Sequence, residues 1–285
     1  MIIKNESLKE TFIKAFENYR KKNFKVAESL CYKILSIDEN HFDSTFLLSN
    51  IHAANNDFVK VKELLSKAAE IQPKNTSVIN NLGNAYRELG KLNEAINFYN
   101  KVLQIDPKHS SANYNLGIAF YRKKKLKDAK NYFEKTIEFQ PNFALAHFNL
   151  GNLQVEFKEY KEAKISYQKV IDLRPDFASA YNNCGLLFRL TGDYENAVKF
   201  YKKTIEIDPK HAGAYNNLGR AYTELGDFKK AMHSHEMGTK LEPENLYHFF
   251  YLNELKNNYL DTKLITKIKK IIEKKDQSKI NLVYG

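Results

Sequence analysis

Apolar side chains recur at helical spacing on either side of a polar break, and this pattern returns every 34 residues along the chain. With proline at position 32 of a 34-residue repeat, seven repeats run without insertion or deletion from Leu8 to Asn245. A fixed period of this size is typical of a repeat solenoid, in which each repeat contacts only its neighbours. The six prolines that mark the period are Pro73, Pro107, Pro141, Pro175, Pro209 and Pro243.

The columns of the repeat predict two helices that pack closely together. Positions 8 and 20 carry small residues in nearly every repeat, which lets two helices approach to the lower end of the usual range of about 8–10 Å. Gly90, Gly192 and Gly226 lie in the break, where a left-handed residue ends a helix readily. The proline ends the second helix, because it has no N–H to continue the hydrogen bonding. We therefore expect a helix-turn-helix hairpin that buries its apolar faces only by stacking on its neighbours.

These columns resemble those of the tetratricopeptide repeat (TPR). The segment Asn80–Tyr86, which reads NNLGNAY, and the segments Glu94-Ala95 and Ile105-Asp106-Pro107 match the signature of that family closely. The resemblance covers residues 8–245 and implies an all-α fold, a right-handed α-solenoid of stacked hairpins. The first repeat departs from the pattern, with Lys14 at position 7 and Glu39 in place of proline, so we interpret it as an N-terminal cap.

The segments outside the seven repeats have different patterns. Residues 1–7 are expected to form an N-terminal extension, and residues 246–285 a degenerate eighth repeat followed by a basic helical segment with Asp261 as its N-cap. This tail resembles the segment that follows the repeats in multidomain bacterial proteins whose TPR arrays precede a sulfotransferase-like domain. On that resemblance, the chain is the front part of a larger protein.

The resemblance also implies which positions line the concave groove of the solenoid, namely 2, 5, 6, 9, 12 and 13. Position 6 is asparagine in five consecutive repeats, which we call the asparagine ladder. An asparagine side chain offers both a donor and an acceptor, so it can pair with the backbone of a peptide whatever the side chains of that peptide. Such a row resembles the one that lines the TPR superhelix of O-GlcNAc transferase. The alternative is that these residues are merely solvated. The ladder consists of Asn81, Asn115, Asn149, Asn183 and Asn217.

Other polar and aromatic residues fall on the same groove positions. Asn84 and Asn152 repeat the amide at position 9, while arginines on the same face suit a carboxylate or a stacked contact. Position 5 holds no lysine, so the carboxylate clamp of the chaperone-adaptor TPR domains is absent. The remaining predicted groove residues are Arg87, Tyr114, Tyr121, Arg122, Arg189 and Arg220.

The net charge of +11 is concentrated in runs of lysine. The main runs are RKKKLKDAK at residues 122–130 and the seven lysines of residues 262–285. Such runs usually form a solvated face, whereas a nucleic-acid site needs a continuous basic stripe with stacking aromatics. The groove is expected to present amides instead, so the sequence disfavours a nucleic-acid ligand. Binding to a nucleic acid or an acidic surface stays as a third hypothesis, and it predicts association that depends strongly on salt.

The sequence contains no pattern that predicts membrane insertion, secretion or catalysis. No apolar stretch reaches the roughly 18–20 residues that span a bilayer, the N-terminus lacks the apolar region of a secretory signal, and two distant cysteines favour a reduced, cytoplasmic setting. No phosphate-binding loop, metal-ligand spacing or nucleophile motif is found, so we expect no cofactor and no metal. His41, His109 and His211 all occupy position 34, in the turns between repeats, and are expected to be structural.

The sequence therefore predicts a non-catalytic scaffold that binds an extended peptide in the groove. The alternative is the substrate-presenting TPR region of a larger sulfotransferase or glycosyltransferase. The identity of the partner is beyond the sequence, because TPR grooves share a scaffold but not a ligand. Self-association stays open as well, because an uncapped end of a solenoid can stack on another copy.

Overall fold

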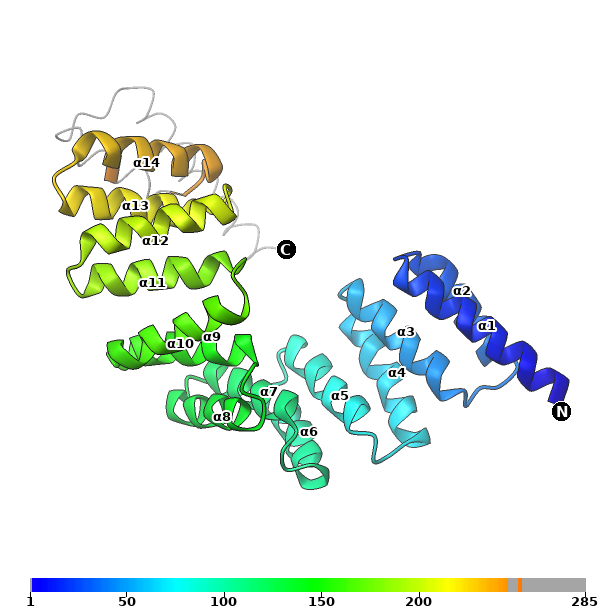
Figure 1. Cartoon of the computed structure of the whole chain (residues 1–285). Helices are drawn as coiled ribbons and strands as arrows, with labels where there is room; N and C mark the ends of the chain where they lie inside the picture. The colour runs from blue at the N-terminus through cyan, green and yellow to red at the C-terminus, as the bar shows by residue number, and fades with distance from the viewer. Residues whose placement is uncertain (1, 246–250, 253–285) are drawn as a thin grey trace, which may run out of the picture. The chain divides into compact units, whose positions relative to one another are not determined.

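A computed structural model of the chain describes residues 2–245 together with Tyr251 and Leu252. These residues form fourteen numbered α-helices and no strand (Figure 1), which confirms the all-α prediction. The predicted tail, residues 246–285, lies outside the described residues apart from Tyr251 and Leu252. The helices are α1 (Ile2–Arg20), α2 (Phe24–Leu35), α3 (Phe42–Ala54), α4 (Phe58–Ile71), α5 (Thr76–Glu88), α6 (Leu92–Ile105), α7 (Ser110–Arg122), α8 (Leu126–Phe139), α9 (Ala144–Glu156), α10 (Tyr160–Leu173), α11 (Ala178–Leu190), α12 (Tyr194–Ile207), α13 (Ala212–Glu224) and α14 (Phe228–Leu241).

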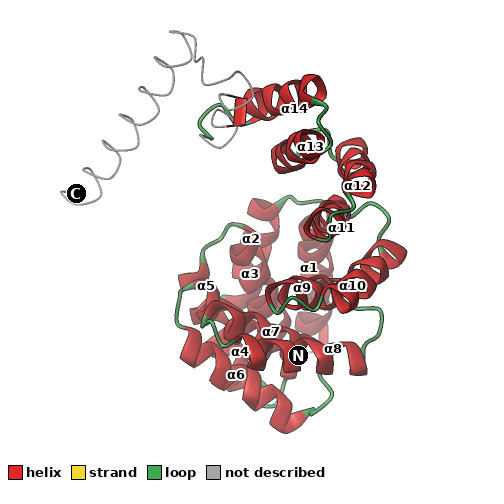
Figure 2. Ribbon diagram, turned by 90° about the vertical axis from the view of Figure 1, so that its left-hand side faces the viewer, coloured by secondary structure: helices red, strands yellow, loops and turns green. Residues whose placement is uncertain are grey.

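Each repeat supplies one hairpin of two helices (Figure 2). The first helix of repeats two to seven covers positions 1–13, and the second begins at position 17 in every repeat, as the polar break predicts. One boundary differs from the prediction. Helix α1 begins at Ile2, so residues 2–7 continue the first helix rather than forming a separate extension.

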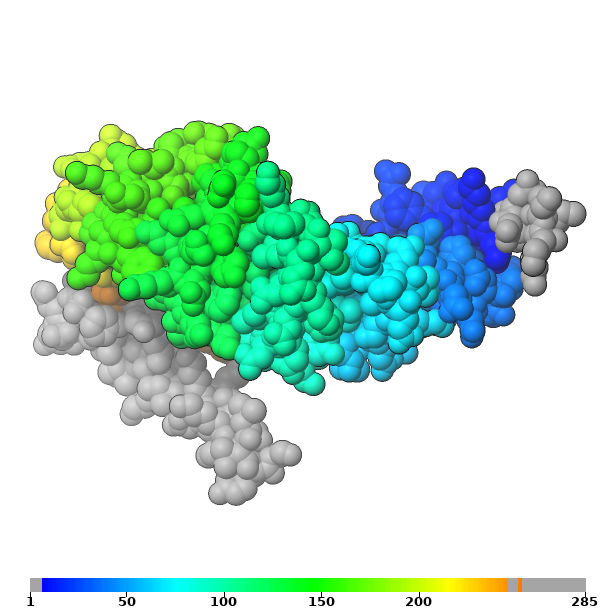
Figure 3. All heavy atoms as spheres, turned by 90° about the horizontal axis from the view of Figure 1, so that it is seen from below, coloured from blue at the N-terminus to red at the C-terminus, as the bar shows by residue number. Residues whose placement is uncertain are grey.

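The contacts divide the chain into two compact units, Met1–Ala146 and His147–Gly285, called here the N-terminal half and the C-terminal half. In the N-terminal half each helix from α1 to α7 packs against the next one in the chain, and neighbouring first helices also touch, as α1 does α3 and α5 does α7. Figure 3 shows its hairpins side by side in chain order. In the C-terminal half the same relation joins α11 to α13. Each half is thus a stack of hairpins. No helix among the described residues combines the length and apolar character needed to cross a bilayer.

The turn inside every hairpin uses the same backbone conformation. Position 15 has a positive φ in all seven repeats, and Gly90, Gly192 and Gly226 supply it as predicted. In the other four repeats a residue with a side chain adopts this left-handed conformation, although L side chains rarely do so. The hydrogen bond from Lys91 N to the Tyr86 carbonyl, 2.9 Å, closes the end of α5 in the manner of a Schellman motif. The four residues with side chains are Lys22, Asn56, Lys124 and Lys158.

A ring at position 24 fills the space left by glycine at position 8. A Cβ placed on Gly83 would lie 2.4 Å from the ring of Tyr99, and one on Gly117 would lie 2.5 Å from the ring of Phe133. The same relation holds for Gly151 with Tyr167, Gly185 with Tyr201 and Gly219 with His235. The first two repeats instead place Ala15 opposite Cys31 and Ser49 opposite Leu65.

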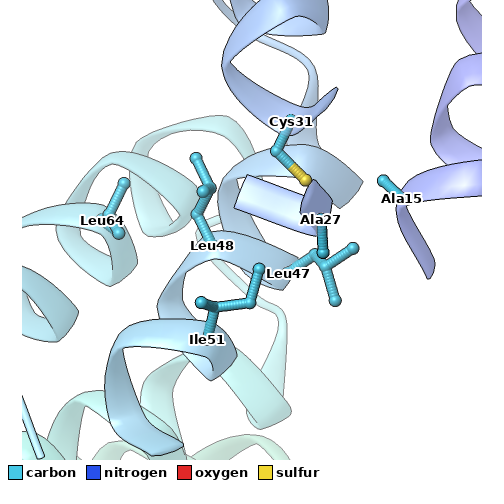
Figure 4. Close-up of a cluster of buried hydrophobic side chains, with 7 residues drawn as sticks. All are labelled: Ala15, Ala27, Cys31, Leu47, Leu48, Ile51 and Leu64. Atoms are coloured by element: carbon cyan, nitrogen blue, oxygen red, sulfur yellow. The ribbon is translucent and has the colours of Figure 1, made fainter. Parts of the chain in front are cut away.

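In the core of the first repeat, a larger residue at position 8 is likewise combined with a smaller residue at position 24. Its buried side chains are short or aliphatic and come from α1 to α4 (Figure 4). An alanine at position 8 is compatible with a small thiol at position 24, whereas a glycine at position 8 makes room for an aromatic ring. The cluster consists of Ala15, Ala27, Cys31, Leu47, Leu48, Ile51 and Leu64.

The histidines at position 34 are N-caps. The Nδ1 atom of His41 accepts a hydrogen bond from Ser44 N at 3.2 Å, and His211 Nδ1 accepts one from Ala214 N at 3.0 Å. His109 caps α7 in the same way. These contacts satisfy backbone donors that have no partner within the first helical turn. The prediction that these histidines are structural is therefore confirmed.

Candidate functional site

The five asparagines of the ladder lie on the first helices α5, α7, α9, α11 and α13. Asn115 is buried, with 7% of its surface exposed, and the other four are half-buried. Asn81 and Asn115 belong to the N-terminal half, and the remaining three to the C-terminal half. The side chains are thus neither fully solvated nor, except for Asn115, enclosed in the core.

In the N-terminal half, hydrogen bonds within the chain occupy both polar atoms of Asn115. Its Nδ2 donates to Asn80 Oδ1 at 3.1 Å, and its Oδ1 accepts from Arg87 Nη1 at 2.9 Å. Arg87 Nε also donates to Glu88 Oε1 at 2.9 Å. Arg122 completes the group, with Nη2 3.6 Å from Glu88 Oε1 and Nη1 donating to the Arg87 carbonyl at 3.3 Å. Arg87 and Arg122, predicted as ligand contacts, therefore share one carboxylate, and Arg87 also binds Asn115.

Two of the three asparagines at position 9, Asn84 and Asn152, each accept a hydrogen bond from a buried tyrosine. The third, Asn50, has Leu65 at position 24 of its repeat. Tyr99 donates its hydroxyl to Asn84 Oδ1 at 2.9 Å, and Tyr167 donates to Asn152 Oδ1 at 2.8 Å. Tyr99 is fully buried, and this burial raises its pKa to about 12. A buried hydroxyl without an acceptor is unfavourable, so these asparagines have a structural role as well as a place on the groove. Tyrosine at position 24 accompanies asparagine at position 9 in these two repeats, but the second repeat combines Asn50 with Leu65 and the sixth combines Leu186 with Tyr201. The sequence alone therefore does not predict this pairing.

In the C-terminal half the amides form a connected relay. Asn217 Nδ2 donates to Asn182 Oδ1 at 3.1 Å, and Asn182 Nδ2 donates to Asn183 Oδ1 at 3.2 Å. Asn183 Nδ2 then donates to Asn152 Oδ1 at 2.8 Å. Three successive first helices, α9, α11 and α13, are linked in this way. The relay includes Asn182, at position 5, which the prediction left out of the site.

The two arginines of the C-terminal half are placed differently from Arg87 and Arg122. Among the described residues, neither Arg189 nor Arg220 forms an ion pair with a carboxylate. The Nε atom of Arg189 is buried without a hydrogen-bond partner. The guanidinium group of Arg220 lies 5.4 Å from the centroid of the Tyr251 ring, which is within range of a cation–π contact.

The predicted groove tyrosines take part in packing. The Tyr114 ring lies 4.9 Å from that of Phe143 and 5.8 Å from that of Phe133, distances typical of aromatic pairs. The Tyr121 ring has Lys124 Nζ 5.8 Å from its centroid. Both tyrosines are half-buried, so each keeps part of its ring accessible.

A cavity of about 170 Å³ lies beside the ladder in the N-terminal half, between α3, α4 and α5. Its floor is apolar, and amides form part of its rim. The sequence interpretation did not predict it. Ala53 is part of its lining, at a position where the neighbouring repeats carry Tyr19 and Arg87. The lining residues are Ser49, Asn50, Ala53, Phe58, Val61, Leu65, Asn81, Asn84 and Ala85.

Models of one repeat family match most of this stack of hairpins. Models described as TPR repeat or tetratricopeptide repeat match residues 64–97, 83–124, 110–143, 144–177, 185–226 and 212–245, which together exceed half of the chain. The chain is a tetratricopeptide repeat protein. The family assignment agrees with the helical hairpins and with the 34-residue period, and it carries no information on a transferase domain.

Solved structures of other TPR proteins share the fold. YrrB, described as a TPR protein with an unusual peptide-binding site, is 24% identical with a TM-score of 0.57, and the match covers 66% of this chain and 97% of YrrB. The pilF protein of Pseudomonas aeruginosa is 21% identical with a TM-score of 0.65, over 74% of this chain and 96% of its own. A TPR protein from Parabacteroides merdae is 18% identical with a TM-score of 0.65, over 88% and 99%. No curated protein matches this TPR protein.

Proposed function

We propose that this TPR protein is a non-catalytic interaction scaffold that binds an extended segment of a partner protein along the first helices of its repeats. The observation that carries the proposal is the series of half-buried amides on successive first helices, which offers paired donors and acceptors to a peptide backbone. The family is consistent with this role, and the peptide-binding site named for YrrB adds support from a protein of the same fold.

Peptide binding exchanges hydrogen bonds rather than creating them. The amide groups of Asn182, Asn183 and Asn217 bind one another, so a peptide must replace these contacts with its own N–H and C=O groups. Each such exchange contributes only about 0.5–1.5 kcal/mol. The backbone contacts therefore set the direction and register of the peptide, while most of the affinity comes from side-chain subsites.

The cavity beside Asn81 and Asn84 is suited to be one of these subsites. Its volume of about 170 Å³ is similar to that of apolar cavities of about 150 Å³ that hold a benzene molecule. Burying one aliphatic or aromatic side chain there contributes about 1.5–3 kcal/mol. The amides on the rim are placed beside the backbone of the same ligand residue. We therefore expect the bound segment to carry an apolar anchor at this point.

The alternative function, presentation of substrates to a sulfotransferase or glycosyltransferase domain, rests on the resemblance of residues 246–285. Almost all of these residues lie outside the described part of the chain. This alternative stays a prediction, and no observation on the hairpins favours it over a plain scaffold.

The test of the proposal is selection of a phage-displayed peptide library on the full chain, followed by calorimetry with the enriched peptide. Replacing Asn115, Asn149 and Asn183 together by alanine is expected to weaken binding at least tenfold. The matched control replaces Asn97, Asn100 and Asn131, which are exposed on second helices, and should leave affinity unchanged. Thermal melting of each variant separates lost binding from lost fold. Unchanged affinity in the ladder variant, with the fold intact, would contradict the proposal.

A further inference from the structure

The C-terminal half contains a group of hydrogen-bond donors that its own residues leave unsatisfied. Tyr201 is completely buried, and its hydroxyl makes no hydrogen bond of normal geometry. Arg189 Nε is buried in the same condition. Burial raises the pKa of Tyr201 to about 12. The positive charges of Arg189 and Arg220 act against this rise, as does a close side-chain contact between Arg189 and the hydroxyl, so both guanidinium groups lie near the hydroxyl.

The third repeat provides a matched site in which the same donors are satisfied. Tyr99 and Arg87 occupy the positions of Tyr201 and Arg189 in their repeat. Tyr99 donates to Asn84, and Arg87 donates to Glu88 and to Asn115. One acceptor serves the phenol, and one carboxylate neutralises the guanidinium group.

The sixth repeat lacks the acceptor of the phenol and the carboxylate, although Asn217 keeps the position of Asn115 in the repeat that follows. Leu186 stands at the position of Asn84, and Leu190 stands at the position of Glu88. The tyrosine and the arginine are present at both sites, so only the partners differ. Arg189 lies on the first helix α11, and Tyr201 lies on the second helix α12 that packs against it. Since buried donors without acceptors destabilise a fold, this pair points to an acceptor supplied by a ligand.

The donors define the chemistry of that ligand. The two guanidinium groups offer only N–H donors and a positive charge, and the phenol adds an O–H donor. A carboxylate offers only acceptors, carries the opposite charge and fits the fork of an arginine side chain. Asn216, on the same helix as Arg220, has its Oδ1 atom buried without a partner, and this atom can accept an N–H from the peptide backbone.

We propose that Arg189, Arg220 and the hydroxyl of Tyr201 form a subsite for a carboxylate of the bound segment, either an acidic side chain or the C-terminal group. The proposal rests on the function proposed above and adds the class of residue that the partner must carry. It is distinct from the chaperone-adaptor clamp that the sequence excludes, because it uses positions 9, 12 and 24 and no lysine.

The test compares two peptide pools of equal length on the full chain, one with aspartate and glutamate and one with asparagine and glutamine at the same positions. Each pool is made with a free and an amidated C-terminus, so that the two sources of the carboxylate are separated. We expect the wild-type chain to prefer one carboxylate-bearing pool at least tenfold. Replacing Arg189 and Arg220 by leucine should abolish this preference, whereas Arg87→Leu should leave it in place.

A second variant tests the same idea in a chain that keeps both arginines. Leu190→Glu restores the carboxylate that the third repeat has at this position, so we expect it to occupy the subsite from within. It should abolish the preference for carboxylate-bearing peptides and raise the melting temperature. Equal binding of all four pools by the wild-type chain, acidic or amide and with a free or an amidated C-terminus, would overturn the carboxylate subsite but leave peptide binding intact. Failure of every pool to bind would overturn both proposals.

Discussion

The ring of Tyr99 occupies the space in which a side chain on Gly83 would lie, with only 2.4 Å between the nearest ring carbon and an ideal Cβ on the glycine. Five of the seven hairpins use this arrangement, and a flat ring inserted beside a bare backbone brings the two helices together. The contact explains why position 8 must be glycine in some repeats and only small in others.

Replacing Gly83 by alanine is expected to lower the free energy of unfolding by about 1–3 kcal/mol, because the methyl group forces the buried ring to move. The measurement is urea denaturation followed by circular dichroism. Gly213→Ala is the control, since the nearest atom there lies at 3.4 Å, and it should leave stability unchanged or improve it. In a Tyr99→Leu background the penalty of Gly83→Ala should shrink, and an equal penalty in both backgrounds would contradict the packing explanation.

The bond between Tyr99 and Asn84 should behave as a coupled pair. Asn84→Ala leaves a buried hydroxyl without an acceptor, so we expect a loss of about 1–3 kcal/mol. Asn84→Ile combined with Tyr99→Phe recreates the pair that the fourth repeat uses, Ile118 with Phe133, and should recover most of the loss. A double-mutant cycle measures the coupling, and additive effects would show that the two side chains act independently.

The left-handed residue at position 15 should prefer glycine wherever it is now something else. Lys124→Gly is expected to stabilise the fold by about 0.5–1 kcal/mol, because glycine adopts φ of +60° without steric penalty. Gly90→Lys should have the opposite effect. Lys123→Gly is the control, since its φ is −80°, and it should not stabilise. A shift of the melting temperature in the same direction for Lys123→Gly and Lys124→Gly would refute the conformational explanation.

The fold should lose stability at alkaline pH. Burial raises the pKa of Cys31 to about 11 and that of Cys184 to about 12, from 9.0, and it raises that of Tyr99 to about 12, from 10.0. The folded chain therefore holds these protons more tightly than the unfolded chain, so their stabilising effect is complete below pH 9 and declines as the pH rises towards the folded values. Urea midpoints measured from pH 8 to pH 11 should fall steadily above pH 9. A flat profile would mean that these groups are not buried as described.

The sequence predicted the architecture because the architecture depends on local patterns. The prolines and the small residues at positions 8 and 20 suffice to place fourteen helices. The glycine at position 90 also predicts the left-handed conformation that it adopts. Lys124 gives no such sign, because its left-handed φ is imposed by the hairpin around it and not by its own preference.

The candidate site was predicted in outline only. Position in the repeat places Asn115 and Arg87 on the groove-facing helix, but it does not say that they bind each other. Hydrogen bonds between side chains on different helices depend on the distances between those helices. The residue types at one position of the repeat do not give these distances. Comparing two repeats is more informative, since Leu190 stands in place of Glu88 and so marks Arg189 as an arginine without the carboxylate that Arg87 has.

The contact between ring and glycine joins two residues of the same hairpin, as Gly83 and Tyr99 do. Every hairpin from the third to the seventh thus contains both the glycine and the ring of this contact. Removing or duplicating such a hairpin as a 34-residue block separates no glycine from its ring. The array can therefore gain or lose whole hairpins while the interior of each hairpin stays the same. The number of ligand residues that the first helices can contact changes with the number of hairpins.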